Sequence, residues 1–212
     1  MQLNSYLEHT ILKQGLLKKN IEEAVEICLN NNVPTLVAPP SMINLTSEII
    51  GTNELSLCTV IGFPLGYNSM SVKLYEIQDV IYNGANEIDL VIDNSLVKNG
   101  NWKELNLEFA AYRKACGSRI LKVIIETSLL NVQEIINITT LLIENKIDFV
   151  KTSTGFVGEG AKFEHIALIK ETFRDQIKIK ASGGIRNKES VEKFIEAGAD
   201  RIGTSSTLEI LS

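Results

Sequence analysis

The sequence has few of the residues that interrupt a chain, cross-link it or anchor it in a membrane. It contains four prolines and three cysteines, and no stretch approaches the roughly 18 apolar residues that a membrane span requires. Cys28, Cys58 and Cys116 lack the spacing of a metal site, and their odd number fits a reducing compartment. Residues 1–12 show neither the basic nor the apolar part of a signal peptide. We therefore expect a cytoplasmic protein without a metal.

Charge of one sign is also scarce. Lysine and arginine number 21 against 26 aspartates and glutamates, which gives a net charge of −5 from interspersed residues. This pattern offers no basic stripe for nucleic acid and no cationic helix face for a membrane surface. The motifs GxxxxGK[ST] and GxGxxG are absent, so neither a nucleoside triphosphate site nor a dinucleotide site is indicated. A small anionic ligand would need donors arranged locally.

What the sequence does contain is a regular alternation of β-rich runs and helix-patterned segments, without a Pro/Ser/Gly-rich linker. Strands alternating with helices pair in parallel through right-handed crossovers. Eight such units predict one (β/α)8 TIM-barrel domain over residues 1–212, with an open doubly wound sheet as the alternative. The eight predicted strands are residues 9–12, 35–38, 57–62, 87–92, 120–126, 148–153, 177–182 and 201–203.

Two helix starts are marked by polar residues. Asn20, with Glu23 three residues later, predicts a capped helix that begins at Ile21. Asn187 predicts a second helix start, and Gly198 predicts where that helix has ended.

Alternation along the strands sorts the side chains into an outward apolar set and an inward set. Glu87 and Asp89 alternate with apolar residues, so both are predicted to face the barrel interior. The same alternation predicts these inward residues on the next three strands: Lys122, Ile124 and Glu126; Phe149, Lys151 and Ser153; Lys178, Lys180 and Ser182.

Three of these inward lysines, Lys122, Lys151 and Lys180, are spaced 29 residues apart, which is one repeat unit each. Crowded ammonium groups in a site with little water lower one another's pKa. A neutral lysine attacks carbonyl carbon, and the iminium that it forms accepts electrons during the making and breaking of C–C bonds. Asp89 can exchange the protons. The cluster therefore predicts aldolase chemistry without a metal, although a single lysine in a strand is more often ion-paired or snorkelling.

The remaining interior charges have a structural interpretation. Glu87 and Glu126 are the expected ion-pair partners of the lysines that form no covalent bond, and Lys178 is expected to be one of those lysines. His9 is expected to be a hydrogen-bonded interior residue rather than a catalytic base.

Glycines follow the last three predicted strands, within residues 152–155, 182–185 and 203–206. Glycine lets backbone N–H groups close on an anion, and hydroxyls add further donors. Since barrels commonly bind phosphate at the loops after their seventh and eighth strands, these loops predict a phosphate site.

Six segments, in the same order and spread over nearly the whole chain, resemble deoxyribose-phosphate aldolases. They are residues 58–66, 87–92, 121–127, 149–156, 180–186 and 201–206. The resemblance implies a class I aldolase, without a cofactor, that reversibly cleaves 2-deoxy-D-ribose 5-phosphate to D-glyceraldehyde 3-phosphate and acetaldehyde in deoxynucleoside catabolism. It also implies a homodimer.

The resemblance assigns roles by position. Lys151 matches the Schiff-base lysine, Lys180 the second catalytic lysine, Asp89 the proton-transferring aspartate and Lys122 a supporting lysine. The positions that match phosphate contacts are Gly155, Gly183, Gly184, Gly203, Ser205 and Ser206.

Three features depart from the family pattern. Glu8 stands where the family has aspartate, which adds a methylene to a position that supports the proton relay. The segment around Val37, before Pro39, lacks the cysteine that the family usually has there, and residues 93–96 are more polar than the usual pattern. These departures leave open a non-catalytic sugar-phosphate-binding barrel. A third hypothesis is another phosphate-binding barrel enzyme, such as an isomerase, that uses Asp89 as its base and does not need Lys151.

Overall fold

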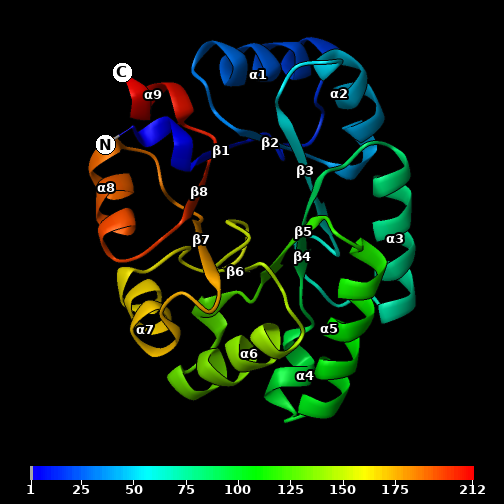
Figure 1. The fold of residues 1–212 in the computed structure, drawn as a ribbon, viewed down its shortest axis with the longest axis vertical. Coiled ribbons are helices and arrows are strands. Elements are labelled where there is room, and N and C mark those ends of the chain that lie inside the picture. Colours follow the sequence, from blue (N-terminus) through cyan, green and yellow to red (C-terminus); the bar gives the residue numbers. More distant parts are fainter. Residues whose placement is uncertain (1) are drawn as a thin grey trace.

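A computed structural model describes residues 2–212. Its eight parallel strands form a closed barrel in sequence order, with β8 paired to β1 (Figure 1). The fold class predicted from the alternation is confirmed, and the open sheet is excluded. The strands are β1 (Leu7–Thr10), β2 (Thr35–Ala38), β3 (Ser56–Ile61), β4 (Glu87–Val91), β5 (Ile120–Ile124), β6 (Phe149–Lys151), β7 (Lys178–Ser182) and β8 (Arg201–Thr204).

Helices surround the barrel on its outer side (Figure 1). They are α1 (Lys18–Asn30), α2 (Ile43–Ile50), α3 (Met70–Tyr82), α4 (Asn94–Lys98), α5 (Trp102–Cys116), α6 (Val132–Glu144), α7 (Phe163–Phe173), α8 (Lys188–Glu196) and α9 (Thr207–Leu211). Short 3-10 turns are η1 (Leu3–Tyr6), η2 (Pro40–Met42) and η3 (Thr127–Leu129). None of the helices within residues 2–212 has the length and apolar character needed to cross a membrane.

The two predicted helix starts have different outcomes. Asn187 does cap α8, since its side chain accepts the Ser190 N–H at 2.9 Å, and Gly198 follows the end of that helix. The prediction for Asn20 was wrong, because α1 begins at Lys18 and Asn20 already lies inside its first turn. The Asn20 side chain instead accepts the Leu17 N–H at 3.0 Å, so it satisfies the helix end from within.

The predicted strand ends differ from the observed ones where the backbone leaves extended geometry. The run predicted as residues 120–126 ends at Ile124, and Glu126 adopts a left-handed conformation with φ of +53°. At β1 the strand begins two residues earlier than predicted, because Leu7 pairs with Ile202 of β8. Barrel closure therefore sets that boundary.

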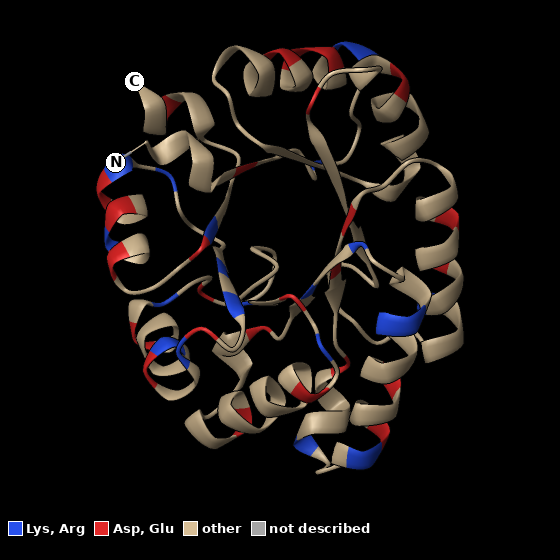
Figure 2. Cartoon of the chain, in the orientation of Figure 1, with Lys and Arg blue, Asp and Glu red and all other residues tan. Residues whose placement is uncertain are grey.

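The hydrophobic core lies between the barrel and the helices. Outward side chains such as Ile88, Leu90, Leu121 and Val123 are fully buried in one continuous apolar cluster. Figure 2 shows that charged residues occur on the strands as well as on the outer helices. One face of the strands therefore packs against the helices, and the other faces the barrel interior, which contains charged side chains.

Gly66 follows β3 where the chain comes close to the carbonyl group of Ile92. Its φ is +75°, and a Cβ added there would overlap the Ile92 oxygen. Gly15 has a similar φ of +71° but open space around its Cα, so it serves as a matched control.

We predict that Gly66→Ala lowers the free energy of unfolding more than Gly15→Ala. Both substitutions place alanine in the left-handed region, at a cost of about 1–2 kcal/mol, but only the former also displaces backbone. Denaturant unfolding of the two variants measures the difference, and equal losses would contradict this account of Gly66.

Candidate active site

Asp89 on β4 lies at the centre of a buried charge network. Its Oδ2 atom contacts the Nζ atoms of Lys151 at 2.7 Å and Lys180 at 2.6 Å. Its Oδ1 atom contacts Lys122 Nζ at 3.1 Å and Cys58 Sγ at 3.2 Å. The structure thus brings together the aspartate and the three lysines that the sequence placed inside the barrel, and it adds Cys58.

A second carboxylate, Glu8 on β1, completes the network. One of its oxygens accepts from Lys180, and the other lies 3.4 Å from Lys122 Nζ. Lys122 also pairs with Glu87 at 2.5 Å, which confirms the predicted partnership of Glu87 with a lysine. Lys151 has a single carboxylate partner, Asp89, among the ion pairs of residues 2–212.

Two of the expected structural ion-pair residues lie elsewhere. Glu126 was predicted to pair with a lysine, but its Oε2 atom accepts the Thr154 N–H at 3.0 Å and the Thr154 hydroxyl at 2.6 Å. Its left-handed backbone aims the side chain at the loop after β6. Lys178 is exposed at the start of β7, where its Nζ lies 5.5 Å from the centre of the Phe149 ring. Alternation predicts a face of the strand but not a depth along the barrel.

The three lysines differ in the direction of their pKa shifts. Burial lowers the pKa of Lys151, and this effect outweighs the attraction of Asp89 while Lys180 lowers the pKa further. Burial also opposes the charged forms of Lys180 and Lys122, but their carboxylate partners outweigh it and raise both pKa values. The predicted mutual depression of lysine pKa values was therefore wrong for Lys122 and Lys180 and holds for Lys151.

Asp89 remains ionised within this network. Burial by itself would raise its pKa, but Lys122, Lys151 and Lys180 together hold the pKa well below its usual range. An isolated general base would need a pKa nearer to neutrality. The arrangement instead suits a carboxylate that passes protons between two amines that it already contacts.

A cavity of about 520 Å³ opens at the C-terminal ends of the strands. Lys151 lines it, whereas Lys122, Lys180 and Asp89 do not. The predicted phosphate contacts that line the same cavity are Gly155, Gly183, Gly184, Gly203 and Ser205. Ser206 does not line it, and its N–H donates to Thr204 Oγ1 at 3.0 Å just before α9.

The glycine loops pack closely against one another at this cavity. A Cβ added to Gly183 would lie 2.9 Å from the Cα of Gly160 and 3.2 Å from the Cα of Gly155. Backbone thus forms this part of the wall without intervening side chains, which is the kind of surface that binds anions.

Sequence reasoning missed several residues of the cavity and its surroundings. Thr154 and Arg186 line the cavity, and an Arg directly after a Gly-Gly-Ile loop was a usable signal for an anion site. His9 also lines it and contacts Thr207 Oγ1 at 2.8 Å, so the predicted interior hydrogen bond is confirmed. Burial lowers the pKa of His9 to about 4, although the charge of Glu209 opposes this effect. The lowered pKa keeps the imidazole ring neutral at pH 7.

One group of ligand atoms within residues 2–212 is compact enough to surround a metal ion. Atoms of Glu8, Cys58 and Asp89 lie within 4.8 Å of one another. The ammonium groups of Lys122 and Lys180 already contact these carboxylates. A divalent cation at this position would face both ammonium groups, so the residues do not fit a metal ion.

Comparison with protein families identifies the catalytic family. The family model for DeoC/LacD family aldolases matches residues 12–212. The chain belongs to this aldolase family. Deoxyribose-phosphate aldolase 1 of Vibrio vulnificus strain YJ016 is 39% identical over 210 residues, which cover 99% of this chain and 96% of that relative. The protein is therefore a lyase, as the lysine cluster predicted.

Solved structures agree with the barrel. The structure described as QR15, an aldolase, superimposes with a TM-score of 0.93 at 39% identity and covers 98% of this chain and 93% of its own. Deoxyribose phosphate aldolase from Aeropyrum pernix, described as a unique tetramer, gives a TM-score of 0.89 at 29% identity and covers 99% and 89%.

The pairing of Asp89 predicts a pH-dependent stability. Because its pKa is lowered in the folded state, its contribution is present above the unfolded pKa of about 4 and is lost as the pH falls through the folded value. We predict that Asp89→Asn lowers the free energy of unfolding at pH 7 by about 3–5 kcal/mol, because buried ammonium groups lose their partner. The difference from the unsubstituted protein should narrow on acidification.

Asp175→Asn is the control, since the Asp175 side chain is 93% exposed although it pairs with Lys170 at 2.6 Å. Denaturant unfolding across the pH range measures both variants. Equal losses for the two would contradict the network.

Proposed function

We propose that the protein is a class I aldolase that reversibly cleaves 2-deoxy-D-ribose 5-phosphate to D-glyceraldehyde 3-phosphate and acetaldehyde in deoxynucleoside catabolism. The observation that carries this proposal is Lys151, a buried amine with a lowered pKa that faces the cavity and contacts Asp89. Membership of the aldolase family and a relative named deoxyribose-phosphate aldolase support the choice of substrate.

In the first step, the neutral Lys151 amine adds to the aldehyde carbon C1 of the open-chain sugar. The resulting carbinolamine loses water and becomes an iminium ion. Asp89 lies 2.7 Å from Lys151 and 2.6 Å from Lys180, so Lys180 can supply the proton for the departing water through Asp89. We assign Lys151 as the Schiff-base lysine and Lys180 with Asp89 as the proton-transfer pair.

In the second step, the C2–C3 bond breaks and its electron pair moves into the iminium, which becomes an enamine. The hydroxyl on C3 gives its proton to the Asp89–Lys180 pair as glyceraldehyde 3-phosphate forms. The Asp89–Lys180 pair then returns this proton to C2 of the enamine, and water hydrolyses the new iminium to acetaldehyde and free Lys151. Atoms and charge balance without a metal or a cofactor.

Glu8 and Lys122 support this pair in the proposal. The extra methylene of Glu8, compared with the family's aspartate, still allows its carboxylate to reach Lys180. Lys122 holds the other oxygen of Asp89, which leaves Oδ2 for the two catalytic amines. The departure at Glu8 is therefore compatible with turnover.

The phosphate end of the substrate is assigned to the glycine loops. The proposed contacts are Gly155, Gly183, Gly184, Gly203, Ser205 and Ser206. All but Ser206 line the cavity that Lys151 lines, which supports their assignment. Ser206 is included only because its position matches the family's phosphate contacts. We further propose that residues 1–212 act as one catalytic domain in the cytoplasm, where Cys28, Cys58 and Cys116 stay free thiols.

Imine trapping tests the proposed function. Acetaldehyde forms an imine with the reactive lysine, and borohydride reduces this imine to an N-ethyl amine. The protein should therefore carry one added ethyl group, and peptide mapping should place it on Lys151. Lys151→Leu should abolish trapping and lower the rate of sugar-phosphate cleavage at least about a thousandfold. Chelators should change neither result.

Lys178→Leu is the matched control, because it removes an exposed lysine from the neighbouring strand. It should trap acetaldehyde normally. Unchanged labelling in Lys151→Leu, or turnover that survives this substitution, would refute the assignment and favour a base-driven isomerase.

We also propose a homodimer formed through the outer face of α3. Six of the fourteen exposed large apolar side chains of residues 2–212 gather on α3 and the segment before it: Leu65, Tyr67, Met70, Val72, Tyr75 and Tyr82. Val72, Tyr75 and Tyr82 recur at helical spacing, so they share one face of the helix. A twofold axis would bury the same patch on both copies.

Light scattering tests the dimer. We predict a dimeric protein that the double substitution Tyr75→Glu and Tyr82→Glu converts to a monomer, while Val132→Glu on α6 leaves the dimer intact. A monomeric unsubstituted protein would contradict the proposal.

A further inference from the structure

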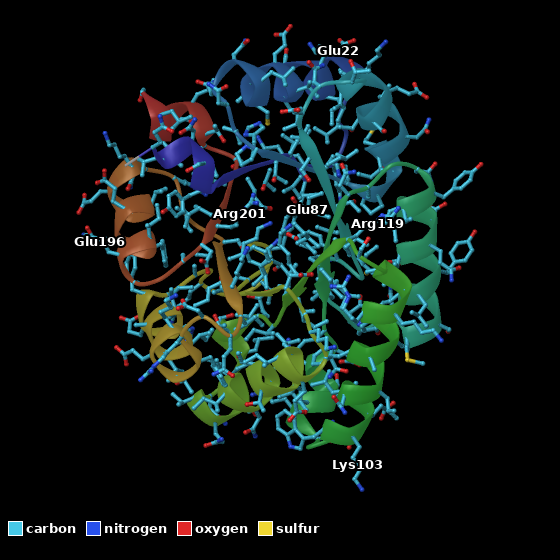
Figure 3. The ribbon with its side chains drawn as sticks, in the orientation of Figure 1. Glu22, Glu87, Lys103, Arg119, Glu196 and Arg201 are labelled. Atoms are coloured by element: carbon cyan, nitrogen blue, oxygen red, sulfur yellow. The ribbon has the colours of Figure 1, made fainter. Side chains whose placement is uncertain are left out.

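Arg201 is a charged residue of the barrel interior to which the proposed reaction assigns no role. It begins β8, so it lies at the end of the barrel opposite the cavity. In Figure 3, Arg201 and Glu87 both lie within the ring of strands. The Arg201 Nη1 atom donates to Thr35 Oγ1 at 3.0 Å and lies 3.8 Å from Glu8 Oε1.

Arg201 faces the side of the carboxylate network that the lysines leave incomplete. Glu8 Oε1 is buried and has no hydrogen-bond donor among residues 2–212, and its two nearest cations are Lys122 and Arg201. The Arg201 charge also lowers the pKa of Glu87, after the larger effects of burial, Lys122 and Ser56. Arg201 therefore acts on two of the three carboxylates without touching the cavity.

The charges of the barrel interior balance only when Arg201 is counted. Three carboxylates, Glu8, Glu87 and Asp89, face three cations, Lys122, Lys180 and Arg201. With Arg201 present, the interior is neutral while Lys151 carries no charge. Without Arg201, one negative charge is in excess, and protonation of Lys151 would restore neutrality.

We propose that Arg201 is an electrostatic positioning residue for the aldolase reaction: its charge completes the balance of the buried carboxylates and leaves the Lys151 amine free to attack the carbonyl. This proposal rests on the proposed function, because it concerns the nucleophile of that reaction. Arg201 acts through Glu8 and Glu87 and touches no reacting atom.

Lys151 is the group whose titration should respond, because its pKa is already lowered by burial. The charged and titratable groups of the barrel interior are Glu8 and His9 on β1, Cys58 on β3, Glu87 and Asp89 on β4, Lys122 on β5, Lys180 on β7 and Arg201 on β8. Lys13, Glu23 and Arg186 line the same cavity as Lys151, and Glu126 bonds to Thr154. The pKa values of Lys122, Lys180 and Cys58 are raised, and those of His9, Glu87 and Asp89 are lowered. β2 contributes Thr35, which is not a titratable group.

The test compares the pH dependence of kcat/KM for cleavage of 2-deoxyribose 5-phosphate in charge variants. The acidic limb reports protonation of free Lys151. Arg201→Met and Arg201→Gln should move this limb to higher pH by about half a unit or more. The 22% exposure of the arginine side chain, and so its screening by water, keeps the expected shift small. Arg201→Lys, which keeps the charge, should leave the limb in place.

Arg119→Met is the matched control. Arg119 precedes β5 at the same end of the barrel, and its Nε donates to the Ala85 carbonyl rather than to the interior carboxylates. Figure 3 labels both arginines. This variant loses the same charge and should keep the acidic limb of the unsubstituted protein. Arg201→Gln keeps a polar side chain that can reach Thr35. If Arg201→Met does not fold, the pH dependence of kcat/KM is measured on Arg201→Gln instead.

The pH dependence of imine trapping with acetaldehyde on the same variants separates the two proposals. A matching shift in trapping and cleavage supports the role of Arg201. Suppose that the unsubstituted protein traps acetaldehyde and cleaves the sugar phosphate. If Arg201→Met and Arg201→Gln then keep its acidic limb, or if Arg119→Met shifts that limb equally, the Arg201 proposal is overturned and the proposed function is not. Failure of the unsubstituted protein to trap acetaldehyde overturns the proposed function and, with it, this one.

Discussion

The interior of the barrel depends on the burial of Asp89 among three lysine side chains. Removing a carboxylate from water costs several kcal/mol unless close partners replace its hydration. Lys122, Lys151 and Lys180 supply these partners, and Cys58 contacts the same carboxylate. Each lysine is in turn buried, so the removal of Asp89 would leave buried amines with fewer carboxylate partners. The chemistry of the site follows from how unevenly these partners are shared.

That unevenness separates one lysine from the other two. Lys122 and Lys180 each contact at least two carboxylates, which offset burial and hold the positive charge. Lys151 has one partner, which it shares with Lys180, and it alone of the three lines the cavity. A nucleophile must lose its proton at the pH at which the enzyme works. In the free protein the fold thus provides one amine that loses its proton more easily and two that hold theirs, all from the same residue type.

Much of this could be predicted from the sequence because a parallel barrel is periodic. The 29-residue spacing of the lysines and the alternation around Asp89 required only the repeat length and the two faces of a strand. Depth along the barrel axis could not be predicted in this way. Lys178 was expected inside but lies exposed at the start of β7. Glu126 bonds to Thr154, because its left-handed backbone depends on a neighbouring loop rather than on its own strand. Which carboxylates each lysine contacts depends likewise on strand register. These contacts determine whether the pKa of each lysine is raised or lowered.

Among the three buried lysines, it is Lys151, and neither Lys122 nor Lys180, that loses its proton readily. An NMR titration of the lysine side-chain nitrogens in the free protein measures this directly, with the Lys151 signal identified by its absence in Lys151→Leu. We expect Lys151 to titrate below the value of about 10.4 of an ordinary lysine, while Lys122 and Lys180 stay protonated beyond it. A Lys151 signal that titrates at or above that value, or a Lys180 signal that titrates first, would show that Lys151 is not the easily deprotonated amine.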